Sequence, residues 1–467
     1  MTPARRALAA LLAVPVLLAA GCGRSPSAAA PSISPPPPAG SAGERTGAVW
    51  TSGLATSGQL GRPGAGIDPD LAPATGPGGK GRLDGVHAVA GGGRHSLAIV
   101  GGGEVVAWGA NDHGQLGDGT TRDRSAPVPV RAPGGGGGRL DGVVAVSANN
   151  DFSMALRRDG TVVTWGEGSS GQRGIGERTA PRLPTTVLAP DGNGPLTGIT
   201  AIAADGHTEL ALRRDGQVLA WGANDYGNLG DGTREDRSLP VPVRGLDGRG
   251  HLTGVSRISV AGQHGLALLR DGRVASWGHN DLGQLGDGTR RDKLVPGLVS
   301  GVRGASGVHG KGHLTGISAI AAAEKHNYAL RDDGTVVAWG NNTAGQLGDG
   351  TVELRTAPVP VVGEDPGDER LHRVADVFAG EAYGAAIRTD GTTLTWGAGG
   401  SGQLGSGKRA PRSRPGPVAF AGGTAPGRAL AVGVGERHLI LLASPQNPQV
   451  PQDSRGGSGS DSPGPDA

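Results

Sequence analysis

Three sets of residues in this chain have types and spacings that could form a metal-binding or phosphate-binding site. The first is a series of histidines that recur at one place in a repeated pattern: His95, His264, His326 and His438. A zinc site needs several imidazoles that converge on one point. Other copies of the pattern have different residues at that place, namely Phe152, Thr208 and Tyr383. We therefore interpret the histidines as structural side chains that pack or hydrogen-bond within each repeat.

The second set is a series of carboxylates in Gly-Asp-Gly-Thr segments, at Asp118, Asp231, Asp287 and Asp349. Calcium binding requires several oxygens from one compact loop in a recognisable order. Asp112 and Asp118 lie six residues apart and lack that spacing of ligands. Capping of turns explains these carboxylates better, because Asp side chains readily hydrogen-bond the backbone two residues further on.

The third is residues 402–408, Gly-Gln-Leu-Gly-Ser-Gly-Lys, which nearly match a phosphate-binding loop. That motif needs Ser or Thr after the lysine and a helix whose first amides face the phosphates. Arg409 follows instead, and no helical periodicity is present. The segment is one copy of a repeated Gly-Gln-Leu-Gly pattern. Since no nucleophile elbow or isolated carboxylate pair occurs either, we expect no enzymatic activity, no metal and no cofactor.

The repeat that positions all these residues is marked by the tryptophans. They are spaced by 56 to 62 residues, and six of the seven precede a glycine: Trp50, Trp108, Trp165, Trp221, Trp277, Trp339 and Trp396. A fixed place in every unit, beside a glycine that permits close approach of the backbone, indicates packing between strands or neighbouring units. A constant period of this length is typical of one small unit stacked many times.

Residues 253–299 show the order of strands, turn and loop in one unit. Two runs of alternating apolar and polar residues flank Asp271-Gly272, which is a strong hairpin signal. A Gly-rich loop follows Trp277, and a last short run closes the unit. In several units that run contains Pro-x-Pro, which favours an edge strand because proline cannot donate to a ladder. Each unit thus predicts three good strands and a poor outer fourth, the pattern of a propeller blade.

A count of half-units predicts how the ring closes. Trp50 has no front half before it, and residues 431–442 form a front half with no tryptophan half after it. Joined, these two pieces complete a seventh blade. We predict an all-β, seven-bladed β-propeller of four-stranded blades over residues 47–443, closed by the N-terminal and C-terminal half-repeats.

The series Gly-x-x-His-x-x-Ala-Leu, Asp-Gly, Val-x-x-Trp-Gly-x-Asn and Gly-Gln-Leu-Gly resembles the repeat of the regulator of chromosome condensation family. The resemblance covers residues 47–443 with seven copies and implies a seven-bladed propeller of four-stranded blades. Two departures stand out. Extra residues at 300–311 lengthen one step to 62, and residues 100–103 lack the Asp-Gly turn.

The first 22 residues have the features of an export signal. Arg5 and Arg6 precede an apolar stretch over residues 7–20, which is too short to span a bilayer. Residues 18–22, Leu-Ala-Ala-Gly-Cys, resemble a bacterial lipobox, although Ala19 stands where that pattern prefers leucine. We expect acylation of Cys22, the only cysteine of the chain. An ordinary cleaved signal peptide is the alternative.

The remaining composition bears on partners. Residues 23–46 and 444–467 are rich in Pro, Ser, Ala and Gly, so we expect a disordered tether and a disordered tail. Without residues 1–22 the chain has equal numbers of basic and acidic residues, 42 each. A neutral body lacks the basic footprint of a nucleic-acid binder. We expect a monomer that contacts the membrane only through an N-terminal lipid.

Variable residues on the constant scaffold are the candidates for specificity. After each Trp-Gly pair the copies have different residues. Among these, His113, Tyr226 and Leu282 are the candidate partner-binding residues. The alternative is that these loop residues vary without any role in binding. The expected function is a non-enzymatic scaffold, exported and lipid-anchored at the outer face of the bacterial cell membrane, that binds an unknown envelope protein. The alternatives are a secreted inhibitor of a penicillin-interacting enzyme such as a β-lactamase, and a guanine-nucleotide exchange factor-like regulator.

Overall fold

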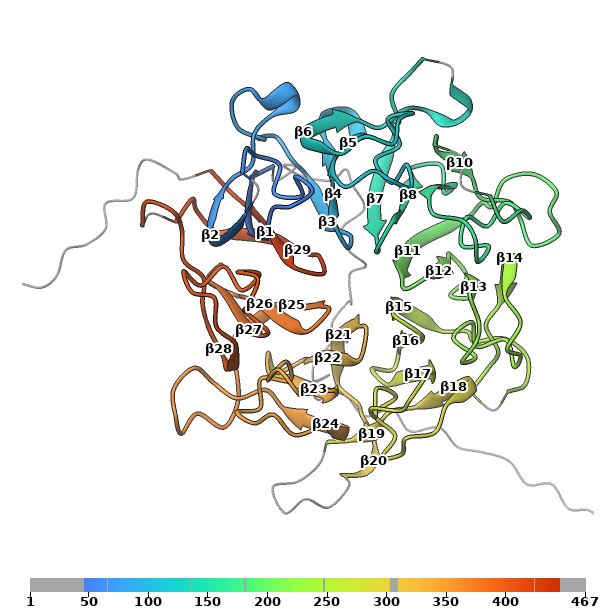
Figure 1. Ribbon diagram of the computed structural model, residues 1–467. Helices are drawn as coiled ribbons and strands as arrows, with labels where there is room; N and C mark the ends of the chain where they lie inside the picture. Colours follow the sequence, from blue (N-terminus) through green and yellow to red (C-terminus); the bar gives the residue numbers. More distant parts are fainter. Residues whose placement is uncertain are drawn as a thin grey trace, which may run out of the picture. The chain divides into compact units, whose positions relative to one another are not determined.

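The computed structural model describes residues 46–445, except residues 65, 136, 180–181, 247, 303–309 and 424. Within these residues the chain forms seven four-stranded antiparallel sheets arranged around a common axis (Figure 1). The predicted seven-bladed propeller is therefore confirmed. None of the helical segments in the described part is long and apolar enough to cross a membrane. They are short 3-10 turns: η1 (Pro77–Gly79), η2 (Gly101–Gly103) and η3 (Pro133–Gly135).

Blades are numbered along the chain, so that blade 1 begins with β3 and blade 7 combines strands from both ends. Seven inner strands line the axis: β3 (Ala88–Gly91), β7 (Val143–Ala148), β11 (Ile199–Asp205), β15 (Val255–Ala261), β21 (Ile317–Ala323), β25 (Val374–Gly380) and β29 (Ala429–Val434). The second strands are β4 (His95–Val100), β8 (Phe152–Arg157), β12 (Thr208–Arg213), β16 (His264–Leu269), β22 (His326–Arg331), β26 (Tyr383–Arg388) and β30 (His438–Ala443).

Each third strand contains the tryptophan of its blade. They are β5 (Glu104–Gly109), β9 (Val162–Gly166), β13 (Val218–Gly222), β17 (Val274–Gly278), β23 (Val336–Gly340), β27 (Thr393–Gly397) and β1 (Ala48–Leu54). The outer strands are β6 (Arg124–Pro129), β10 (Thr185–Thr186), β14 (Arg237–Pro242), β18 (Lys293–Leu298), β24 (Arg355–Pro360), β28 (Arg412–Pro417) and β2 (Ile67–Pro73). The Pro-x-Pro runs lie in these outer strands, where a missing N–H group breaks no inner ladder.

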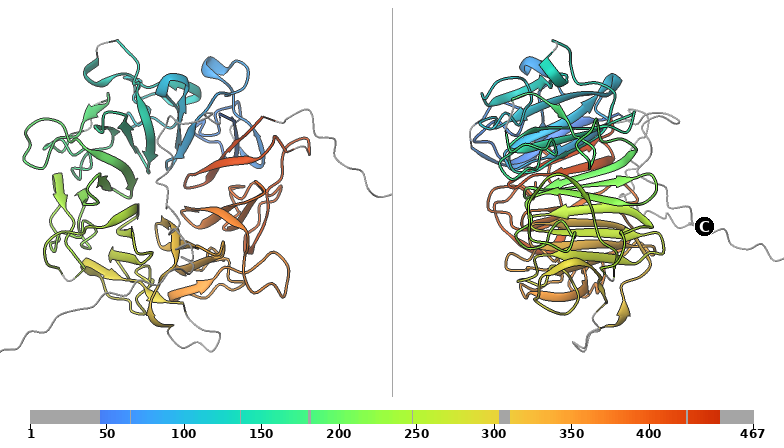
Figure 2. Two further views of the ribbon diagram at one scale, coloured as in Figure 1. Left: turned by 180° about the vertical axis from the view of Figure 1, so that it is seen from behind. Right: turned by 90° about the vertical axis from the view of Figure 1, so that its right-hand side faces the viewer.

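The two ends of the described chain meet in blade 7. Strand β1 pairs antiparallel with β30 from Ala48–Ala443 to Gly53–His438, and the sheet order is β2-β1-β30-β29. The views of the ring in Figures 1 and 2 place this mixed blade between blades 6 and 1. The predicted closure by two half-repeats is thus the observed one.

Apolar side chains from neighbouring blades fill the space between them. Successive side chains of a strand point to opposite faces of the sheet. Because every blade lies between two neighbours, both of its faces are buried. In the seam between blades 1 and 2, for example, Leu97 and Ile99 of one blade pack with Val163 and Trp165 of the next. Every pair of neighbouring blades has such a cluster among the described residues. The ring is therefore held together by its seams.

One addition interrupts the regular array. Strands β19 (Ser300–Gly301) and β20 (Gly310–His313) form a two-stranded sheet between blades 4 and 5. It coincides with the extra residues that lengthen one tryptophan step to 62.

Candidate functional site

Two sets of loops come out at the same end of the ring. Because the blades are antiparallel, the turn from inner to second strand and the loop from third to outer strand share one end, while the Asp-Gly turns lie at the other. We call the first end the loop face. Its long loops are residues 55–66, 110–123, 167–184, 223–236, 279–292, 341–354 and 398–411.

The carboxylates of Gly-Asp-Gly-Thr lock these loops internally. In blade 1, the Asn111 Nδ2 group donates to Asp118 Oδ1 at 3.1 Å, and Arg124 Nη2 lies 2.7 Å from Asp118 Oδ2. Burial raises the pKa of the Asp118 carboxyl, but hydrogen bonds from Thr120 and Arg124 outweigh it and lower the pKa. The arrangement recurs in three further blades: Asn224, Asp231 and Arg237; Asn280, Asp287 and Lys293; Asn342, Asp349 and Arg355. Across the described residues, no cluster of His, Cys, Asp or Glu suits a metal ion.

Six tryptophans each join two neighbouring blades. Their Nε1 groups donate to backbone carbonyl oxygens of the preceding blade's loop at 2.8–3.0 Å: Trp108 to Gln59, Trp165 to Gln115, Trp221 to Gln172, Trp277 to Asn228, Trp339 to Gln284 and Trp396 to Gln346. Trp50 departs from this pattern, because its buried Nε1 has no hydrogen-bond partner and its ring packs edge-on against Phe420 at 5.7 Å.

The glycine that ends each Gly-Gln-Leu-Gly segment makes room for the next tryptophan. A Cβ atom on Gly286 would come within 2.7 Å of Trp339 Nε1, and Gly286 has φ +64°. Glycine at this position therefore serves both the turn and the close approach of the indole.

Three of the four recurring histidines hydrogen-bond a neighbouring blade. The sequence had suggested contacts within a single blade. His95 Nε2 lies 2.9 Å from Ser153 Oγ of the next blade, and His264 Nε2 lies 2.8 Å from Asn327 Oδ1. His438 crosses in the same way to Ser96, whereas His326 contacts Tyr328 within its own blade. For His95, His264 and His438 the Nε2 partner therefore lies in the next blade and not, as predicted, within the same blade. Sequence periodicity gives the place of a side chain but not the blade that it faces.

Burial keeps these imidazoles neutral. It lowers the pKa of His95 and His326 to about 3, and that of His264 and His438 to about 4. Their equivalent places, one per blade, are not a converging set of metal ligands.

Glu209 breaks the pattern in the seam between blades 2 and 3. At the equivalent place, Ser96, Ser153 and Asn327 donate to a backbone carbonyl of the preceding blade. The Glu209 side chain is fully buried, and neither of its oxygens has a hydrogen-bond partner. Burial, and next the nearby Asp205 carboxyl, raise the pKa of Glu209 well above its ordinary value.

We predict that Glu209→Gln stabilises the protein in a pH-dependent way. The folded protein keeps the Glu209 proton at pH values where the unfolded chain has released it, so wild-type stability falls as the pH rises above 4.5. The variant is expected to gain about 1–3 kcal/mol in free energy of unfolding at pH 8, and little at pH 4. Urea unfolding at both pH values measures this. The exposed Glu353→Gln is the control, and an equal gain at both pH values would contradict the assignment.

His113 lies in the blade 1 loop and bridges to blade 2. Its Nδ1 atom lies 2.7 Å from Glu167 Oε2 and its Nε2 atom 3.9 Å from Asp151 Oδ2. Gly168 stands where four of the blades have the locking asparagine, and Glu167 is the residue before it. Burial raises the pKa of Glu167, but hydrogen bonds, chiefly from the Ser169 backbone, outweigh it and lower the pKa to about 2. His113 is 41% exposed, so this pair is reachable from the loop face.

Tyr226 and Leu282 lie in the loops of blades 3 and 4. The Tyr226 ring stacks on His279 of the next loop, with centroids 4.0 Å apart and planes inclined by 40°. Leu282 is half-buried, and its backbone N–H donates to Gln284 Oε1 at 2.9 Å. His113 and Tyr226 make the same backbone bond two residues on, to Gln115 and Asn228. The three candidates thus occupy one turn position on one face, each with different neighbours.

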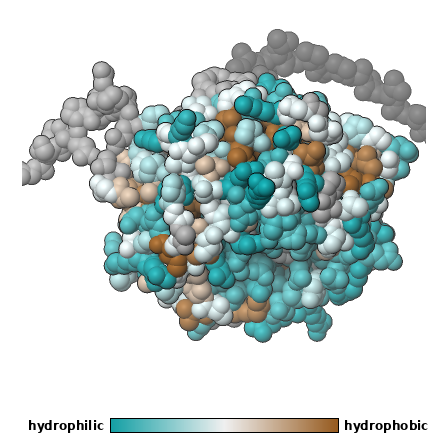
Figure 3. Space-filling view, turned by 45° about the horizontal axis from the view of Figure 1, so that its top comes forward, coloured by the Kyte–Doolittle hydropathy of each residue, from teal (hydrophilic) through white to brown (hydrophobic). Residues whose placement is uncertain are grey.

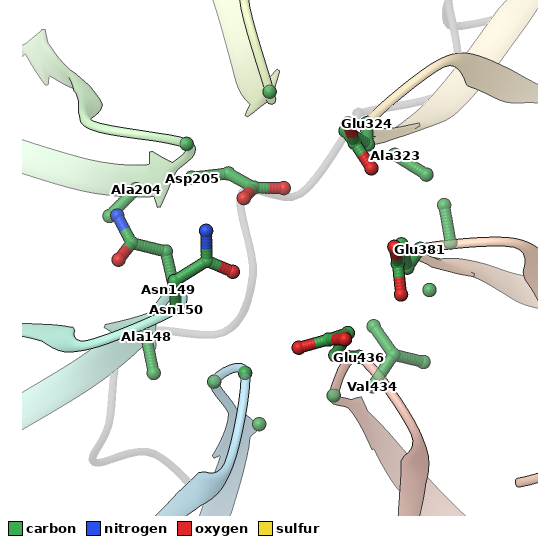
Figure 4. A pocket seen from close by; sticks show the side chains of 18 of the residues that line it. Ala148, Asn149, Asn150, Ala204, Asp205, Ala323, Glu324, Glu381, Val434 and Glu436 are labelled. Carbon is green, nitrogen blue, oxygen red and sulfur yellow. The ribbon is translucent and has the colours of Figure 1, made fainter. Parts of the chain in front are cut away.

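The ring encloses a cavity of about 820 Å³ on its axis, which opens at the loop face. Inner-strand turns from all seven blades line it, and Figure 4 shows Asp205, Glu324, Glu381 and Glu436 around it. The sequence reasoning missed these carboxylates. A signal was present, because three of them precede the recurring His or Tyr by two residues, but only the closed ring brings the turns together.

The exposed apolar surface does not mark a second candidate site. In the face shown in Figure 3, apolar areas are small and separated by polar residues. Within the described residues, Val352 is the large hydrophobic side chain that stands exposed, at 61%. Cys22 and the predicted signal, tether and tail (residues 1–22, 23–46 and 444–467) lie outside the described residues, except residues 46, 444 and 445.

Seven antiparallel blades with tryptophan seams define a tandem-repeat β-propeller. More particularly, the chain belongs to the RCC1-like family. The RCC1-like domain model matches residues 41–313, and the Regulator of chromosome condensation (RCC1) repeat matches residues 317–346, 333–387 and 390–442.

Similar proteins agree with this assignment. The chain is 30% identical to the Ultraviolet-B receptor UVR8 of Arabidopsis thaliana over 338 residues, 71% of this chain and 70% of the receptor. It is 32% identical to the human E3 ubiquitin-protein ligase HERC2 over 288 residues, 62% of this chain but only 6% of that ligase. Two solved structures share the fold. Human WBSCR16 has a TM-score of 0.66 and 23% identity, over 85% of this chain and 99% of that chain. Prp20p of Saccharomyces cerevisiae has a TM-score of 0.67 and 22% identity, over 87% of this chain and 93% of that chain.

Proposed function

We propose that this protein is a non-enzymatic scaffold that binds another protein through its loop face. The observation on which this rests is a set of rigidly locked loops that present different side chains, His113, Tyr226 and Leu282, from one equivalent turn position. Locked loops lose little conformational entropy when a partner binds, and their variable side chains provide specificity. Membership of a family that includes a receptor and regions of ubiquitin ligases supports a binding role.

The proposed location is the outer face of the cell membrane, with an N-terminal lipid on Cys22. Its support is the apolar stretch and the lipobox-like residues 18–22. Mass spectrometry of the mature N-terminus is expected to find an acylated Cys22 as the first residue. An unmodified Cys22, or cleavage elsewhere, would contradict the anchor while leaving the binding role untouched.

Affinity capture from envelope extract tests the binding role. The wild-type chain is expected to recover a specific partner, and Tyr226→Ala/Leu282→Ala is expected to recover at least tenfold less, since aromatic anchors contribute strongly to interfaces. The matched control is Arg214→Ala/Arg270→Ala, two exposed positions by the Asp-Gly turns of the opposite face. Equal recovery by both variants, or no specific partner with the wild type, would contradict the proposal.

A further inference from the structure

The seam between blades 6 and 7 has no tryptophan at the place that the other six seams use. In blade 1, Trp108 pairs with Ser96, the second residue of β4. At the same register position of blade 7, Ser52 pairs with Leu439, the second residue of β30. Trp50 lies two residues earlier in β1 and packs at another place in the same seam. A serine therefore occupies the tryptophan place of this seam.

The loop of blade 6 shows the same difference. In six blades, a Cβ atom on the last glycine of the loop segment would meet the indole of the following blade. A Cβ atom on Gly405 of blade 6 would instead meet Ser52 Oγ, at 3.0 Å. The next nearest atoms are side-chain carbons of Leu71 and Leu439, at 3.3 and 3.6 Å. Among the described residues, no indole donates to the carbonyl oxygen of Gln403, which is the acceptor place of this seam.

Two buried polar atoms of β1 have no partner in this seam. The Ser52 side chain is fully buried, and its Oγ atom makes no hydrogen bond. The Nε1 group of Trp50 is in the same condition. Buried polar groups are nearly always paired in folded proteins, and an unpaired one weakens the arrangement that buries it. Water satisfies both groups when the two blades separate.

The outer part of the seam is fastened, whereas its inner part is not. Leu71 N donates to Ala419 O at 3.0 Å, and Ala421 N donates to Leu71 O at 2.9 Å. Between the second strands, the Tyr383 hydroxyl donates to His438 O at 2.7 Å. The inner strands β25 and β29 make the least contact of the seven neighbouring pairs of inner strands. The backbone bonds of the outer part therefore form a hinge for the rest of the seam.

We infer that the ring opens locally between blades 6 and 7, about this hinge, while the other six seams stay closed. In those seams an indole hydrogen bond resists separation of the blades. Opening at Ser52 breaks no such bond and gives water to two unpaired groups. It also moves the loops 398–411 and 55–66 apart on the loop face, so a ligand that spans both loops would favour the closed ring. The inference goes beyond the proposed binding role and does not depend on it.

Alkylation of a cysteine placed in the seam tests this opening. The full chain with Cys22→Ser has no natural thiol, and Ser52→Cys then adds one in the seam between blades 6 and 7. The matched control is Ser153→Cys, which is equally buried, opposite Trp165, in the seam between blades 1 and 2. Iodoacetamide is expected to modify the folded Ser52→Cys chain about tenfold faster or more than the control, by intact-protein mass spectrometry. Because Ser153→Cys gives up hydrogen bonds to His95 and to the Gln115 carbonyl, any destabilisation of the control narrows this difference.

The urea dependence of alkylation separates local opening from unfolding of the whole ring. Local opening exposes little surface, so the Ser52→Cys rate is expected to stay nearly constant at urea concentrations below the unfolding transition. The Ser153→Cys rate is expected to rise with urea in parallel with global unfolding, which circular dichroism measures. Equal alkylation rates for the two variants, or a Ser52→Cys rate that follows global unfolding, would overturn the inference.

Discussion

Replacing Trp277 with alanine is expected to lower the free energy of unfolding by about 3–5 kcal/mol. The Trp277 side chain is fully buried in the seam between blades 3 and 4, where it packs with Leu210, Leu229 and Val243. Its Nε1 group also donates to the Asn228 backbone oxygen at 2.9 Å. Alanine would leave a large cavity between blades and an unpaired carbonyl. Urea unfolding followed by circular dichroism measures the loss.

The role of the indole N–H is tested separately with phenylalanine. Trp277→Phe removes the interblade hydrogen bond and is expected to cost about 1–2 kcal/mol. Trp50→Phe is the matched control, because the buried Trp50 Nε1 has no partner and its removal is expected to be neutral or stabilising. Equal losses at Trp50 and Trp277 would contradict the assigned role of the hydrogen bond.

Ending the chain after Val434 is expected to abolish the folded state. The deletion removes β30, to which β1 pairs over six residue positions, and exposes the apolar clusters between blade 7 and both of its neighbours. A closed ring without one strand leaves β1 with an unpaired edge. Far-UV circular dichroism and limited proteolysis measure the outcome, with loss of the cooperative thermal transition as the expected result.

A chain that ends after residue 445 is the control for this truncation. It retains every strand of the described residues, and we expect its melting temperature to match that of the full chain. A folded, cooperative protein after truncation at Val434 would show that blade 7 does not close the ring. A destabilised chain after truncation at 445 would show that residues 446–467 contribute to stability, contrary to the expected disordered tail.

The fold could be predicted from sequence because its signals are local and repeated. Trp277-Gly278, the Asp271-Gly272 turn and the Pro-x-Pro outer runs each specify one piece of a blade. The orphan halves at Trp50 and His438 then specify how the ring closes. None of these steps requires knowing which side chains meet across a seam.

The seams and the axial cavity could be predicted only in part, because they depend on contacts between blades. His95 was placed correctly in the repeat, but its partner Ser153 is 58 residues away in the next blade. Nothing in the sequence distinguishes Glu209 from other residues of a second strand, because its burial without a hydrogen-bond partner depends on the neighbouring blade. Glu324, Glu381 and Glu436 lie far apart in sequence, and ring closure alone brings them around one space. Similarly, sequence variation singled out Tyr226, but not the His279 ring on which it stacks.

Hydrogen–deuterium exchange of the captured complex tests most directly the central claim that the loop face binds a partner. The account predicts that binding slows amide exchange in residues 223–236 and 279–292 of the loop face, around Tyr226 and Leu282. Exchange at the Asp-Gly turns of the opposite face, such as residues 214–217 and 270–273, is expected to stay as in the free protein. Protection confined to those turns, with the loop face unchanged, would contradict the account.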